Sequence, residues 1–217
     1  DVVESSTLSS DLTMGGSAAI DVAQDKTLTY EGAALSLGAN TLTISGTGTL
    51  STPSGYVLGD PSSILKLLGT NTVIGPVSLN AGTIDVDDSS TLNSDLTLGG
   101  SATIEVAQDK TLTYEGVSIS IDANILTVAG TGTLSNRNAL VLGNPESVLN
   151  LIDTKISGPV SLNGGAIKVN SSTLSSDLTL GGSASIWFET DKTLTYEGAA
   201  LSLGANMLTL AGSGTLS

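Results

Sequence analysis

The sequence predicts an all-β chain wound into a parallel β-helix, with three short strands in each of about ten coils. Two observations predict this fold. The stretch Ser5–Ser51 returns at Ser89–Ser135 and at Ser171–Ser217, and its first and third copies differ at only 10 of 47 positions. Within each copy, hydrophobic residues recur in pairs separated by one residue, as in strands with one buried face. Repetition of short strands at a fixed period is typical of a solenoid.

The strands follow from the hydrophobic pairs. Successive pairs arrive every seven or eight residues, which leaves room for strands of four to five residues and a short turn, and no segment has helical periodicity. In the second unit the predicted inward positions are Leu96/Leu98, Ile104/Val106, Leu112/Tyr114, Ile119/Ile121, Leu126/Val128, Leu134, Leu140/Leu142, Leu149/Leu151, Ile156, Val160/Leu162, Ile167/Val169 and Leu174.

Grouping the strands in threes gives coils of 23, 21, 20 and 18 residues that begin at Leu96, Ile119, Leu140 and Val160. Four coils make a nested repeat of 82 residues, and the first repeat, from Leu12 to Leu96, has 84. At roughly 4.8 Å per coil, ten coils would form a rod about 50 Å long. A two-faced coil of about 16 residues is the competing arrangement.

The domain organisation is a single continuous array over residues 1–217, with repeat units at about 5–88, 89–170 and 171–217, the last one partial. Because the chain begins and stops in repeat phase, we interpret it as a segment of a longer protein. Open strand edges at its ends could pair with another chain, so end-to-end self-association is an expected interaction.

Glycines mark the predicted corners. At paired glycines, where the chain leaves one face, we expect positive φ angles: Gly15-Gly16, Gly99-Gly100 and Gly181-Gly182. A second kind of corner is expected at Gly46/Gly48, Gly130/Gly132 and Gly212/Gly214.

Substitutions between the copies separate inside from outside. Val22, Val106 and Phe188 align at an inward position, whereas Asp21, Glu105 and Trp187 align at an outward one. A position that accepts Asp, Glu or Trp is not core, so Trp187 is expected to be exposed. The tyrosines of the TLTYEG motif occupy inward positions that hold Leu or Val elsewhere, and we expect them in the core: Tyr30, Tyr114 and Tyr196.

Charge and composition exclude several function classes. Six Lys and Arg137 face 21 acidic residues, a net charge of −14, which disfavours nucleic acid and anionic lipid as partners. No run of 18 apolar residues is present, so this segment is not expected to insert into a membrane. Cysteine is absent, which excludes disulfides and thiolate metal sites.

The sequence lacks residue types that many catalytic mechanisms require. We predict that the chain is not an enzyme and that it has no catalytic, cofactor-binding or metal-binding residues and no cofactor. Histidine and cysteine are both absent, which excludes His-based acid–base catalysis and the Ser-His-Asp and Cys-His nucleophiles. The densest acidic group is Asp85, Asp87 and Asp88. These carboxylates are candidates for glycan cleavage or calcium binding, but the second unit has Lys168 and Asn170 there, so the group is not a repeated feature.

Two further binding alternatives remain open. Exposed Trp187, with tyrosines near it in the pattern, could stack on sugar rings, so a carbohydrate-binding or carbohydrate-cleaving β-helix is the alternative function. Outward TxT pairs suggest an ice-binding solenoid as a lesser alternative, although the coils between the second and third pairs are expected to break the array. The pairs are Thr27/Thr29, Thr111/Thr113 and Thr193/Thr195, and the intervening coils present Thr133, Lys155/Ser157 and Thr173.

Several stretches resemble repeats of bacterial autotransporter passenger domains and filamentous-haemagglutinin-type proteins: DLTLGGSATIEV, TLTYEG, GTGTLS and GPVSLNGGAIKV. The resemblance covers essentially the whole chain and implies a right-handed β-helix displayed on or released from the bacterial cell surface. It also implies a structural or adhesive role, as a stiff spacer or fibre for surface display, adhesion or filament assembly. Surface glycans or the surface of a host or neighbouring cell are the implied partners.

Overall fold

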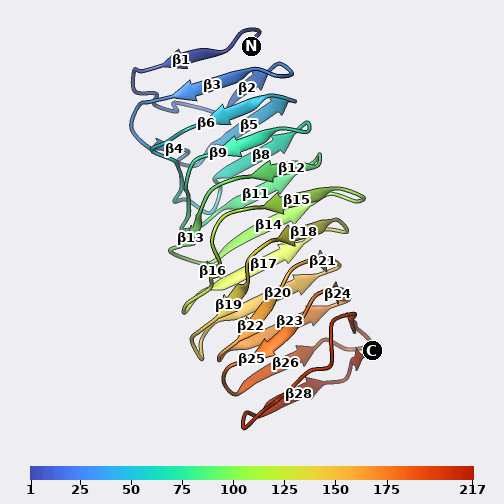
Figure 1. The fold of residues 1–217 in the computed structure, drawn as a ribbon. Coiled ribbons are helices and arrows are strands. Elements are labelled where there is room, and N and C mark those ends of the chain that lie inside the picture. Colours follow the sequence, from blue (N-terminus) through green and yellow to red (C-terminus); the bar gives the residue numbers. More distant parts are fainter.

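The computed structural model describes residues 1–217 as a rod of stacked coils, with the N-terminus at one end and the C-terminus at the other (Figure 1). All regular elements are strands, and every strand pair is parallel and joins one coil to the next. Each full coil contributes one strand to each of three faces, so the three-strand coil is confirmed and the two-faced arrangement is wrong. Coil spacing also agrees, since Ile119 pairs with Leu140, Leu140 with Val160, and Val160 with Leu178.

The first two faces run the length of the rod. We call the ten-stranded face sheet I and the eleven-stranded face sheet II. Sheet I contains β2 (Ala18–Val22), β5 (Thr41–Gly46), β8 (Ile64–Leu68), β11 (Thr83–Val86), β14 (Ala102–Val106), β17 (Ile125–Ala129), β20 (Val148–Ile152), β23 (Ala166–Asn170), β26 (Ala184–Phe188) and β28 (Leu208–Gly212). Sheet II contains β1 (Ser6–Leu8), β3 (Thr27–Tyr30), β6 (Thr49–Ser51), β9 (Thr72–Ile74), β12 (Ser90–Leu92), β15 (Thr111–Tyr114), β18 (Thr133–Asn136), β21 (Lys155–Ile156), β24 (Ser172–Leu174), β27 (Thr193–Tyr196) and β29 (Thr215–Leu216).

The third face, sheet III, is divided into two four-stranded parts. The first part contains β4 (Leu35–Ser36), β7 (Tyr56–Leu58), β10 (Val77–Leu79) and β13 (Leu96–Leu98), and the second contains β16 (Ile119–Ser120), β19 (Leu140–Leu142), β22 (Val160–Leu162) and β25 (Leu178–Leu180). The ladder is interrupted between β13 and β16, in the longest coil of the repeat.

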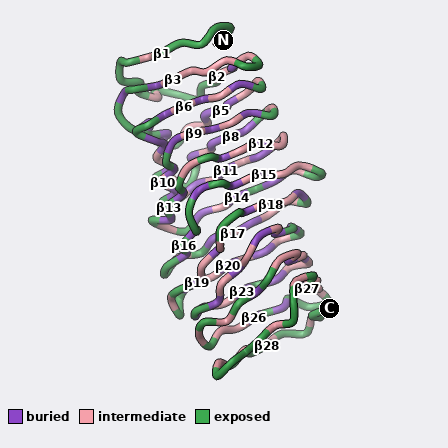
Figure 2. Tube along the Cα trace, in the orientation of Figure 1, coloured by how far each residue is buried: buried purple, intermediate pink, exposed green.

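The core is one continuous column in which the inward side chains of the three faces meet. Figure 2 shows buried positions recurring in successive coils along the rod. A single cluster joins 42 buried residues, from Tyr30 to Leu194. Inward side chains stack on equivalent ones in the next coil, for example Leu65 against Ile84 and Ile84 against Ile104 on sheet I. Burial of this apolar surface, at about 25 cal/mol per Å², is the main favourable contribution to folding.

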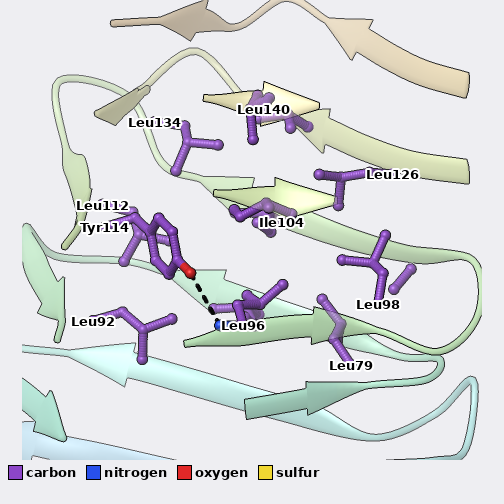
Figure 3. Close-up of a cluster of buried hydrophobic side chains, with 14 of the residues drawn as sticks. Leu79, Leu92, Leu96, Leu98, Ile104, Leu112, Tyr114, Leu126, Leu134 and Leu140 are labelled. Atoms are coloured by element: carbon purple, nitrogen blue, oxygen red, sulfur yellow. Dashed lines mark hydrogen bonds between the residues drawn. The ribbon is translucent and has the colours of Figure 1, made fainter. Parts of the chain in front are cut away.

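The interruption in sheet III is filled by a tyrosine. In the regular part of this face, the amide of Leu140 donates to the carbonyl of Pro159 in the next coil, at 3.0 Å. At the interruption the amide of Leu96 instead donates to Oη of Tyr114, at 3.0 Å (Figure 3). The Asp95 carboxylate accepts a further bond from the amide of Val117, at 3.1 Å. Two side chains thus replace the missing ladder bonds: Tyr114 satisfies the buried amide of Leu96, and Asp95 satisfies the exposed amide of Val117.

The same device recurs in the other two units. Tyr30 accepts a hydrogen bond from the amide of Leu12 at 2.9 Å, and Tyr196 accepts one from Leu178 at 3.1 Å. The expectation that these tyrosines lie in the core is confirmed for Tyr30 and Tyr114, whereas Tyr196 is half-buried. Burial raises the pKa of the Tyr114 phenol. A Cβ atom at Gly116 would overlap the Tyr114 ring, which explains the glycine of the TYEG motif.

We predict opposite outcomes for two Tyr→Phe substitutions. Tyr114→Phe leaves the buried Leu96 amide without a partner, which should lower the free energy of unfolding by about 1–3 kcal/mol. Tyr56 is fully buried too, but its Oη makes no hydrogen bond of good geometry, because the nearby Thr52 hydroxyl donates to the carbonyl of Ile74. Desolvation raises the pKa of Tyr56, and the proximity of Thr52 offsets this only in part. Tyr56→Phe should therefore be neutral or stabilising. Denaturant unfolding of both variants tests this, and equal losses of stability would contradict the assignment.

One expectation about the corners is wrong. The paired glycines at Gly99-Gly100 and its copies do not have positive φ angles. Glycine is required there by close approach, because Cβ atoms at Gly99 and Gly100 would overlap Asn80 in the preceding coil. The second kind of corner is confirmed, since residues 130–132 connect β17 to β18. Gly130 has a positive φ angle of 87°, as do its copies, whereas Gly132 does not.

The terminal coils leave apolar side chains exposed. Val3 is 71% exposed in the first coil, and Met207 and Leu210 are 65% and 51% exposed in the last. In the last coil, residues 201–203 do not form a strand of sheet III, so this face ends at β25.

Candidate functional site

The acidic group Asp85, Asp87 and Asp88 is divided between two lysines. Nζ of Lys66 lies 2.8 Å from a carboxylate oxygen of Asp85 and 2.6 Å from one of Asp87. Nζ of Lys110 lies 2.6 Å from Asp88. Within the whole chain, no group of three or more acidic side chains is arranged to hold a metal ion. The carboxylates proposed from the sequence for calcium or catalysis are thus engaged in ion pairs on the outer surface.

These ion pairs have an electrostatic signature. The hydrogen bonds that Lys66 donates to Asp85 and Asp87 raise its pKa, and the hydrogen bond that Lys110 donates to Asp88 lowers the pKa of that carboxyl. The pKa of Lys110 is raised by the same bond. Both partners of the second pair are solvent-accessible, so its contribution to stability is small and sensitive to salt.

The Asp88–Lys110 pair predicts a pH-dependent effect. Because the folded pKa of Asp88 is lowered, the pair stabilises the protein above the unfolded value of about 3.9 and this is lost as the pH falls through the folded pKa. The raised pKa of Lys110 means that the contribution is lost again as the pH rises through that pKa. Lys110→Gln should therefore lower the melting temperature at neutral pH and converge with wild type in acid. Lys26→Gln is the control, since the equivalent Lys26 forms no ion pair; a deficit for Lys110→Gln that is independent of pH would be inconsistent with this assignment.

Trp187 lies on the outer side of sheet I, as expected from the alignment of the copies. Its side chain is 52% exposed, and Nε1 donates to Oγ of Ser185 at 3.1 Å. It stands between Lys168 in the preceding coil and Ala211 in the next. The neighbour in the next coil, Ala211, has a small side chain, and the neighbour in the preceding coil, Lys168, carries a positive charge. An exposed aromatic ring beside a polar side chain is suited to stacking on a sugar ring.

The outward positions of sheet II form ladders of threonine. Thr111 pairs with Thr133, Thr133 with Lys155, and Lys155 with Thr173, so the expected break at Lys155 is confirmed. In the first half of the rod, however, another column is unbroken. It consists of Thr27, Thr49, Thr72, Thr91 and Thr113, in five successive coils.

A shallow polar groove of about 340 Å³ crosses β21, β24 and β27, and no hydrophobic residue lines it. It forms where the corners between sheets I and II are shortest. Asp153 and Ser171 turn these corners with φ angles of 52° and 47°. Hydroxyl groups of Thr173, Thr193 and other residues line the groove beside Lys155, which pairs weakly with Glu197 at 3.6 Å.

No protein-family model, curated protein or solved structure matches this chain. No helix suitable for crossing a bilayer is present.

Sequence reasoning found Trp187 and the acidic group but missed what surrounds them. The partner of Asp85 could have been found from coil length. Lys66 precedes Asp85 by 19 residues, about one coil, and is its strand partner in the preceding coil. The unbroken threonine column could have been found in the same way, by aligning the first five coils rather than only the repeat copies.

Proposed function

We propose that the chain is a stiff spacer in a bacterial extracellular or cell-surface protein, which holds other parts of that protein away from the surface. The observation that carries this proposal is the architecture itself. Every strand pairs only with strands of adjacent coils, so coils can be added or removed with a change in length alone. The excess of acidic residues keeps such rods apart in solution.

The lack of an enclosed site supports a mechanical role. The acidic group is engaged by lysines, and the grooves at β21–β27 and beside β14 and β17 are shallow. The apolar hollow lined by Leu12, Met14 and Ile20 lies at the N-terminal end of the core column. Continuous parallel ladders along two faces resist bending, because bending would strain hydrogen bonds in every coil on one side.

A display experiment tests the spacer. The chain carries an epitope tag at its N-terminus and is anchored to bacterial cells through its C-terminus. Three versions contain zero, one or two additional copies of residues 89–170. Each copy should raise the tag by about 19 Å, since it adds four coils. Antibody capture should increase with each copy, and Gly/Ser linkers of the same residue number should give less. Equal capture with the flexible linkers would contradict the proposal.

A second candidate function is carbohydrate binding at Trp187, favoured by its exposed indole beside Lys168. Trp187 is the single tryptophan of the chain, so its fluorescence reports on this position alone. Titration with a panel of neutral and acidic oligosaccharides should give a saturable change that Trp187→Ala abolishes in a parallel calorimetric titration. A panel without any saturable response would exclude this candidate and leave the spacer unaffected.

A further inference from the structure

Sheet II presents an ordered row of identical side chains. Threonines occupy one outward column in five successive coils, at positions 27, 49, 72, 91 and 113, and Ser135 continues it. All five are half-buried, so each side chain is held at its base while its outer part faces solvent. Strands in a sheet lie about 4.8 Å apart, so the column repeats a hydroxyl and a methyl group at that interval.

A second column widens the first at its N-terminal end. Thr7 pairs with Thr29, and Thr29 with Ser51, so hydroxyl side chains stand two abreast in β3 and β6 before the column continues with Ile74 in β9. Outward positions two residues apart are separated by roughly 6.7 Å. The β-branched threonine has few rotamers, so its hydroxyl and methyl groups are held in place more firmly than those of longer polar side chains.

The hydroxyl groups of the five-threonine column have no partner within the protein. The threonine hydroxyls that donate to protein groups are those of Thr52, Thr97 and Thr154, which lie at corners or on sheet III. The column hydroxyls must therefore bond to molecules outside the protein, and in solution these are water molecules. Water bound to a regular row of fixed hydroxyls takes up the same spacing.

Charged residues are excluded from this face. The strands of sheet II from β1 to β18 contain none, and Lys155 in β21 is the first. Sheet I, which has the same construction, carries Asp21, Lys66, Asp85 and Glu105 over the same coils. In a chain with a net charge of −14, a neutral face indicates an occupant that offers no charge.

We propose that this threonine face, the outward side of β3, β6, β9, β12 and β15, binds the surface of ice crystals. Ice presents water oxygens in a fixed two-dimensional lattice without net charge. A neutral row of hydroxyls and methyls at a fixed interval, two columns wide in β3 and β6, can order its own hydration water into that lattice and bind through it. The threonine face needs no groove, because the occupant is a flat solid. This activity is separate from the spacer function and is compatible with it.

The test compares two Thr→Lys substitutions. Thr72→Lys places a long cation at the centre of the threonine face, and Thr103→Lys places the same side chain at an equally half-buried outward position of sheet I. Sheet II already accommodates a lysine at Lys155, so Thr72→Lys is expected to fold, and circular dichroism and the melting temperature verify this for both variants. The readouts are the gap between melting and freezing temperatures of a seeded ice crystal, the crystal's shape, and partition of the protein into growing ice.

The wild-type chain should produce a gap between the melting and freezing temperatures, change the shape of the crystal and be incorporated into the growing ice. Thr72→Lys should reduce the gap about tenfold, as expected for disruption at the centre of a contact surface, and Thr103→Lys should leave it unchanged. Absence of a gap in wild type, or equal effects of the two variants, would overturn the proposal. Binding to crystalline cellulose or chitin without any effect on ice, or dimerisation that Thr72→Lys abolishes, would likewise overturn it and assign the face to that occupant. None of these results changes the length measurements that test the spacer.

Discussion

Deletion of residues 89–170 should give a folded rod that is shorter by four coils, or about 19 Å. The deletion joins Asp88 to Ser171, and the new corner reads Asp88-Ser171-Ser172 where the native chain reads Asp88-Ser89-Ser90. Ser90 and Ser172 are both buried at the first position of a sheet II strand, β12 and β24. After the junction, β24 therefore takes the place of β12 on sheet II, and both strands begin with a buried serine.

The control is a deletion that breaks the order of the faces. Removal of residues 89–162 joins β11 to the segment that leads into β23, so two strands of sheet I follow each other and every later strand is displaced by one face. Small-angle scattering should show a shorter rod for the first deletion, and denaturant unfolding should remain cooperative. The second deletion should lose the coils after the junction. If both deletions behave alike, the repeat is not the unit of this structure.

The substitution Gly130→Ala should lower the free energy of unfolding by about 3 kcal/mol or more. Gly130 has φ 87°, a conformation that is strained for a residue with a Cβ atom. A Cβ atom there would also overlap the carbonyl of Val106 in the preceding coil, which is fixed by its own hydrogen bonds. The cost is large because the corner must open or the coils must separate.

Gly143→Ala is the matched control for this glycine. Its φ angle is not positive, and the nearest atom to an added Cβ is a methyl carbon of Val141 at 4.0 Å. Its effect should stay within about 0.5 kcal/mol of zero, as for ordinary surface substitutions. Denaturant unfolding of the two variants measures the difference, and a cost at Gly130 no greater than at Gly143 would show that the corner is not constrained as described.

Much of this fold could be predicted from hydrophobic spacing alone. Alternation identifies the inward side chains, and coil lengths of 21, 20 and 18 residues follow from the positions of Ile119, Leu140, Val160 and Leu178. Such predictions succeed because a one-residue error would turn an entire strand inside out.

Register between strands was harder to predict, because shifts of two residues preserve the inward face. Counting hydrophobic pairs aligns Ile104 with Leu126, but in the structure Ala102 lies opposite Leu126 and Ile104 lies opposite Val128. This shift places the end of β14 beside Gly130 and explains why glycine is needed there. Alanine gives a weak signal of burial, so the sequence pattern did not reveal the shift.

Surface sites could be predicted only as single residues. Trp187 was expected to be exposed because Asp21 and Glu105 occupy its position in the other copies, and it is. The division of the acidic group between Lys66 and Lys110 and the unbroken threonine column both depend on contacts between coils of unequal length. Comparison of the repeat copies does not align those coils, so these features became visible only with the pairing of strands.

Spin-label distances test the stacking of coils most directly. The chain has no cysteine, so pairs introduced by Thr27→Cys, Thr113→Cys and Thr195→Cys can be labelled without other changes. Four coil steps separate the first position from the second and four more separate the second from the third. The account predicts about 19 Å between positions 27 and 113, about 20 Å between 113 and 195, and about 40 Å between 27 and 195. A distance between 27 and 195 well short of the sum of the other two would contradict it.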